Sequence, residues 1–119
     1  MEIIKLHNIK ELAQEFMHSP KVERKGSNVV LLYDYETETG EYEWTGITFL
    51  NTIDHKYTSD EKISEYMVKA YNAIAEVIDL NWMNKEMLDK AYKHYLVYFD
   101  GYGAYEFTST GFVPNITED

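Results

Sequence analysis

The chain contains no cysteine among its 119 residues. This absence excludes a disulfide scaffold, a zinc site built on thiolates and a cysteine nucleophile. Basic residues are scarce as well, because 11 Lys and Arg stand against 21 Asp and Glu, for a formal net charge of -10. A surplus of acid this large argues against binding nucleic acid or an anionic membrane through basic contacts. No apolar run approaches the roughly 18 to 20 residues that a membrane-spanning helix needs.

Familiar catalytic motifs are also missing. The six glycines never take the spacing of a phosphate-binding loop, and none of the four histidines stands in HExxH spacing. Asp34, Glu36 and Glu38 repeat the first three ligand positions of an EF-hand calcium loop. The pattern breaks afterwards, because Thr39 stands at its glycine position and Thr45 at that of its last glutamate. We therefore expect no enzyme, no metal site and no cofactor, and we expect the histidines to be exposed or to cap elements.

The length predicts one domain over residues 1–119, with residues 111–119 as a frayed tail. Residues 2–6 predict a short strand. A helix should follow Asn8, because apolar residues then recur with helical spacing until Pro20 ends the pattern. These apolar residues are Ile9, Leu12, Ala13, Phe16 and Met17.

Two strands are predicted next, at residues 29–36 and 41–50, because β-branched and aromatic residues dominate both segments. Thr39-Gly40 is the turn that we expect between them. Residues 21–28 before this hairpin and residues 51–57 after it are too polar to show a pattern, and we expect loops there.

The second half predicts helix and then a second hairpin. A capping box at Thr58 to Glu61 should start a long helix that reaches residue 78, and a shorter helix should begin near Asn84. Asp100-Gly101 then marks a tight turn between two apolar runs. The aromatic residues that crowd this C-terminal third are expected to pack inside.

These elements together predict an α+β domain. Its antiparallel sheet has about four strands in two hairpins, with two or three helices on one face, in the order α-ββ-α(α)-ββ. A parallel sheet does not fit, because tight turns join the consecutive strands.

The acid is concentrated on the first hairpin. A two-residue turn at Thr39-Gly40 would set Glu38 opposite Glu41 and Glu36 opposite Glu43, which makes a ladder of like charge. No basic residue interrupts this stretch, and three aromatic side chains lie among its carboxylates. The candidate partner-binding residues are Asp34, Glu36, Glu38, Glu41, Glu43, Tyr35, Tyr42 and Trp44.

Two interpretations of this hairpin stand side by side. Exposed charge protects a sheet edge against aggregation, and it also steers a protein toward a basic surface. Folding back of Lys21, Arg24 or Lys25 onto the carboxylates would favour the first interpretation.

We expect a small acidic, non-catalytic inhibitor that occupies the nucleic-acid-binding surface of a basic protein. Mimics of this class act against restriction or CRISPR nucleases, although only size and charge connect the chain with them. An immunity protein or antitoxin against a basic toxin, or a structural or accessory protein of a phage or bacterium, is the alternative. The expected setting is the cytoplasm of a bacterial host cell, with no direct contact to nucleic acid or membrane.

Overall fold

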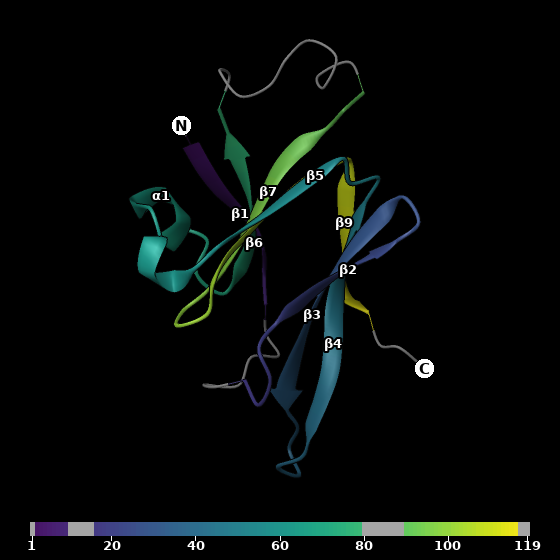
Figure 1. Ribbon diagram of the computed structural model, residues 1–119, viewed down its shortest axis with the longest axis vertical. Helices are drawn as coiled ribbons and strands as arrows, with labels where there is room; N and C mark the ends of the chain where they lie inside the picture. The colour runs from purple at the N-terminus through teal and green to yellow at the C-terminus, as the bar shows by residue number, and fades with distance from the viewer. Residues whose placement is uncertain (1, 10–15, 80–89, 117–119) are drawn as a thin grey trace.

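The computed structural model describes residues 2–9, 16–79 and 90–116. In these ranges the chain forms two antiparallel β-sheets, one of five strands and one of four (Figure 1). Strands hold 62% of the described residues and helices only 7%. The predicted α+β fold, with about four strands in two hairpins and helices on one face, is therefore wrong.

The five-stranded sheet has the strand order β1-β6-β7-β8-β5. Its strands are β1 (Glu2–Asn8), β5 (Asp54–Thr58), β6 (Ala73–Ile78), β7 (Lys93–Phe99) and β8 (Gly103–Ser109). The four-stranded sheet has the order β2-β3-β4-β9. Its strands are β2 (Lys21–Lys25), β3 (Asn28–Glu36), β4 (Tyr42–Leu50) and β9 (Gly111–Ile116). A 3-10 turn, η1 (Asp60–Lys62), and one short helix, α1 (Glu65–Val68), connect β5 with β6.

The main core lies between the two sheets. Because successive side chains of a strand point to opposite faces, every second residue of the central strands enters this core. Phe49 of β4 stacks on Phe107 of β8 with 3.9 Å between ring centroids. Most of the C-terminal aromatic residues are buried, as the sequence predicts: Tyr95, Tyr98, Phe99, Tyr105 and Phe107, whereas Tyr92 and Tyr102 are partly exposed. The buried members of the core are Ile9, Val29, Leu31, Tyr33, Ile47, Phe49, Ile74, Tyr95, Val97, Phe99, Tyr105 and Phe107.

A second, smaller cluster covers the outer face of the five-stranded sheet. Met67 and Ala70, from α1 and the turn after it, pack there against Ala75, Val77 and other residues of the sheet. The segment from η1 to α1 therefore forms a partial third layer, visible at one side of Figure 1. None of the described helices is long and apolar enough to cross a membrane.

The predicted long helix over residues 63–78 is wrong, because its second half is the inner strand β6. Ile74 enters the main core, whereas Ala75 and Val77 enter the outer cluster. This alternation has a period of two, and β6 pairs with β1 on one side and β7 on the other. The helix α1 ends at Val68, and Asn72, with a φ of 50°, lies in the turn directly before β6. Sheet pairing has overridden the local helical pattern.

Three predicted loops or tails are strands as well. Residues 21–25 form β2, residues 54–58 form β5, and residues 111–116 form β9, where a frayed tail was expected. Each of these strands is the edge of its sheet. Edge strands leave many side chains in solvent and carry polar residues, so they lack the apolar pattern on which the prediction depends.

Some of the remaining predictions are confirmed, and others fall largely on residues that the structure does not describe. The strand at residues 2–6 is confirmed within β1, and both hairpins are confirmed as β3–β4 and β7–β8. Most of the helix after Asn8 and of the helix near Asn84 falls on residues 10–15 and 80–89, outside the described residues, and the described ends of both, at residues 16–17 and 91–92, are not helical. Met17 and His18, at the described end of the first helix pattern, form a bend.

Candidate functional site

The acidic hairpin projects at one end of the long axis of the molecule (Figure 1). Its strands pair with Tyr35 opposite Glu43 and Glu36 opposite Tyr42. Residues 37–41 connect them, closed by a 2.7 Å hydrogen bond from the Thr37 amide to the Glu41 carbonyl oxygen. The predicted two-residue turn is therefore wrong, and the register differs by one residue.

A register change of one residue moves side chains to the other face of a strand pair. Glu36 shares one face with Tyr42, whereas Glu43 lies on the opposite face and accepts a 3.1 Å hydrogen bond from the Tyr35 hydroxyl. The expected ladder of carboxylates on one face does not form. The hairpin instead carries negative charge on both of its faces.

Asp34 is not available to a partner, because its side chain is only 1% exposed, so it does not belong to the exposed acidic residues of the hairpin. It accepts hydrogen bonds from the amides of Met17 and His18, at 3.0 and 2.8 Å, and lies 3.0 Å from His18 Nδ1. His18 in turn stacks on Trp44, with 5.7 Å between ring centroids. Asp34 thus fastens the segment before β2 to the outer face of the four-stranded sheet.

The four glutamates of the hairpin are all exposed, and we call them the acidic tip: Glu36, Glu38, Glu41 and Glu43. Lys21 lies 3.6 Å from Glu23 and 5.0 Å above the Trp44 ring. Arg24 donates to the carbonyl oxygens of Gly26 and Thr52, at the other end of its sheet. The ion pairs recorded among residues 2–9, 16–79 and 90–116 leave the acidic tip without a basic partner.

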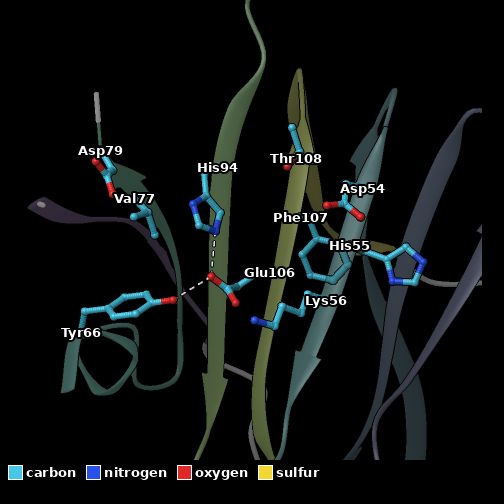
Figure 2. Close-up of a pocket in the computed structure, with 10 residues that line it drawn as sticks. All are labelled: Asp54, His55, Lys56, Tyr66, Val77, Asp79, His94, Glu106, Phe107 and Thr108. Atoms are coloured by element: carbon cyan, nitrogen blue, oxygen red, sulfur yellow. Dashed lines mark hydrogen bonds and ion pairs between the residues drawn. The ribbon is translucent and has the colours of Figure 1, made fainter. Parts of the chain in front are cut away.

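A pocket of about 240 Å³ opens on the outer face of the five-stranded sheet (Figure 2). Its floor comes from the β7–β8 hairpin, which pairs His94 with Thr108 and Leu96 with Glu106. Tyr66 reaches the floor from α1. The Tyr66 hydroxyl donates to Glu106 Oε1 at 3.0 Å, and His94 Nε2 lies 2.9 Å from the same oxygen.

Glu106 keeps its negative charge although its residue is only 8% exposed. Burial raises the pKa of its carboxyl, but the hydrogen bonds from His94 and Tyr66 and the charges of His94 and Lys56 outweigh burial. The pKa of Glu106 therefore lies below its ordinary value of 4.5. Burial, with the charge of Glu106 next to it, raises the pKa of Tyr66 to about 12. The trio stabilises a fixed carboxylate inside the pocket.

This chemistry is suited to holding a charged ligand. Tyr66 and His94 both face the carboxylate, so the contacts stabilise its charge rather than activate a nucleophile. Among the described residues, no three His, Asp or Glu side chains converge as a group able to hold a metal ion.

Sequence reasoning missed this pocket, although one signal was present. Glu106 interrupts an alternation of small and apolar residues in a predicted strand. A two-residue turn at Asp100-Gly101 would set Leu96 opposite Tyr105, whereas the structure connects the strands through residues 100–102 and pairs Leu96 with Glu106. His94 was expected to be exposed or to cap an element, whereas the structure buries most of its side chain beside Glu106.

Comparison with known proteins returned no match, neither among family models, nor among curated proteins, nor among solved structures.

Proposed function

We propose that the protein is a non-catalytic inhibitor that inserts its acidic tip into the nucleic-acid-binding surface of a basic protein. One observation carries the proposal: four exposed carboxylates project from one end of the molecule without a basic partner in the described part of the chain (Figure 1). An uncompensated field of one sign attracts a surface of the other sign and accelerates association with it.

The corrected register refines how the tip engages its partner. Because Glu36 and Glu43 lie on opposite faces, the tip is acidic on both sides of the ribbon. Such a ribbon suits a groove with basic walls on both sides better than a flat basic surface. Clefts that enclose a nucleic-acid backbone have this character.

Trp44 supplies an aromatic contact at the base of the tip. Its side chain is 41% exposed, while His18 stacks on the ring and Lys21 lies above it. A partly held aromatic ring loses little conformational entropy on binding, and tryptophan is the residue most enriched at the energetic centres of interfaces. Trp44 therefore supports the proposal beside the carboxylates.

The test measures inhibition and binding with three basic enzymes: a restriction endonuclease, an RNA-guided nuclease and a basic ribonuclease. We expect inhibition of at least one of them, with binding that weakens steeply as salt shortens the Debye length from about 30 Å at 0.01 M to about 8 Å at 0.15 M. Inhibition of the ribonuclease alone would favour the immunity-protein form of this function.

A charge-reversal pair locates the contact. The double variant Glu36→Lys and Glu43→Lys should abolish inhibition. The control, Glu61→Lys with Glu65→Lys, makes the same change in net charge on exposed residues of η1 and α1 and should retain it. Equal losses in both double variants, binding that ignores salt, or no binding to any of the three enzymes would contradict the proposal.

A further inference from the structure

The pocket at Glu106 is a second site, separate from the acidic tip. It opens beside the end of β6 and the start of β7, whereas the tip lies at the opposite end of the long axis (Figures 1 and 2). The proposed inhibitory contact does not use it. The Glu106 carboxylate is buried and stays charged because Tyr66, His94 and Lys56 compensate the cost of burial, so its charge is available to a ligand.

Charge decides the class of ligand. Asp54 and Glu106 contribute two carboxylates to the lining of the pocket, and Lys56 is the one lysine or arginine beside them in the described part of the chain. The pocket therefore favours a cation over an anion.

Glu106 offers a defined position for that cation. Both of its hydrogen bonds end on Oε1, from Tyr66 and His94, and Oε2 accepts none from the described residues. Figure 2 shows the Tyr66 hydroxyl and the His94 ring converging on that one oxygen. A carboxylate oriented by two fixed donors presents its second oxygen at little entropic cost, so it is preorganised for a charged donor.

Lys56 lies across the strand pair from Glu106 and extends toward it from β5 (Figure 2). No ion pair between them is recorded within 4.0 Å, although the lysine charge lowers the pKa of Glu106. Lys56 is exposed and acts on the carboxylate from a distance. The lysine charge therefore weakens the binding of a cation by repulsion, but the lysine side chain does not occupy the position beside Glu106.

The pocket also has an apolar side. Val77 and the ring of Tyr66 line it opposite β5. A volume of about 240 Å³ accommodates a compact organic molecule and is large for a single inorganic ion. We propose that this pocket binds a small organic ammonium compound, with the cation against Glu106 Oε2 and the carbon chain beside Val77 and Tyr66.

Three probes that share a five-carbon chain test the charge preference: cadaverine, pentanediol and glutarate. We expect isothermal titration calorimetry to show one cadaverine per protein molecule and at least tenfold weaker binding of the diol and the diacid. Nuclear magnetic resonance shifts should centre on Tyr66, His94 and Glu106. The proposal is wrong if glutarate or pentanediol binds as tightly as cadaverine, or if the shifts centre on the acidic tip. It is also wrong if cadaverine does not bind at about 10 mM, a concentration at which a ligand with a millimolar dissociation constant would be mostly bound.

Variants assign the role of each charge. Glu106→Gln keeps the shape and an acceptor oxygen while removing the charge, so cadaverine binding should weaken at least tenfold. Glu61→Gln, on exposed η1, removes an equal charge away from the pocket and should leave binding unchanged. Retained binding in Glu106→Gln would overturn the proposal.

A second pair of variants applies if Glu106→Gln does not fold. Asp54 and Lys56 are exposed on the edge strand β5, where substitution disturbs the core little. Lys56→Gln should tighten cadaverine binding about threefold or more, and Asp54→Asn should weaken it by a similar factor, because exposed charge pairs contribute little individually. Binding that stays unchanged in both variants would refute the proposal.

Discussion

The buried carboxylate of Asp34 gives the sharpest test of how the segment before β2 is held against the four-stranded sheet. Replacing it by asparagine preserves the shape of the side chain but leaves only one acceptor oxygen. In the native protein Oδ1 accepts from the Met17 amide, while Oδ2 accepts from the His18 amide and contacts His18 Nδ1. The side-chain NH₂ group of asparagine must therefore face one of two amide donors.

The magnitude follows from the contacts that are lost. A buried donor left without an acceptor costs about 1 to 3 kcal/mol, and hydrogen bonds to a charged acceptor are about twice as strong as neutral ones. We expect Asp34→Asn to lower the free energy of unfolding by about 2 to 4 kcal/mol, a large share of the roughly 5 to 15 kcal/mol typical of a domain. The urea midpoint should fall by about 1 to 2 M, since a domain of this size loses about 1 to 3 kcal/mol per M urea.

Urea unfolding followed by circular dichroism measures this change, and His18→Ala is the control. The His18 side chain is 62% exposed, so its contact with Asp34 should contribute less than about 1 kcal/mol. The reasoning fails if Asp34→Asn stays within about 0.5 kcal/mol of the wild type. It also fails if His18→Ala costs as much as Asp34→Asn, because the imidazole would then hold the segment instead of the amides.

Two further predictions concern the core and high pH. Gly103→Ala should destabilise the fold by about 2 to 4 kcal/mol, because its φ is +126° and a Cβ there would clash with the Thr58 carbonyl oxygen. Gly101→Ala, with a φ of +82° and open space, should cost only about 1 kcal/mol, and equal urea midpoints would contradict this difference. The pKa values of Tyr66 and Tyr105 are raised from 10.0 to about 12, chiefly by burial. Folding favours the protonated form of both phenols, so their contribution to the free energy of unfolding is complete below pH 10 and is lost toward pH 12. Urea midpoints should therefore fall over that interval, and a flat profile would refute the raised pKa values.

The strands that the sequence reveals are those with the strongest local pattern. β3, β4, β7 and β8 are rich in β-branched and aromatic residues and are joined as hairpins, so short-range signals suffice. β6 was misread as helix because its spacing in Ala73–Ile78 also fits one helical face when read with the residues before it. Pairing with its two neighbours makes this segment a strand. β1 lies far away in the sequence, and β7 follows only after an intervening segment, so neither partner is visible in the local pattern.

The candidate sites, like the strands, could be predicted only where the sequence carries a local signal. Charge along the chain located the acidic hairpin, but the register depends on how residues 37–41 close the turn. Alternation alone placed Asp34 among the exposed acids, whereas its donors lie 16 and 17 residues earlier in the chain. Glu106 depends on donors 12 and 40 residues away. Contacts of this kind carry no periodic signal, so a single sequence does not display them.

The strand order also has a consequence for the kinetics of folding. β2-β3-β4 and β6-β7-β8 are runs of consecutive strands, whereas β1, β5 and β9 reach their partners β6, β8 and β4 from distant parts of the chain. We expect the two three-stranded units to form first and the distant strands to dock later, with overall folding in about milliseconds to seconds. Until docking is complete, β4, β6 and β8 each present an unpaired edge. Refolding yield should therefore fall as protein concentration rises, because those edges pair between molecules before their own strands arrive.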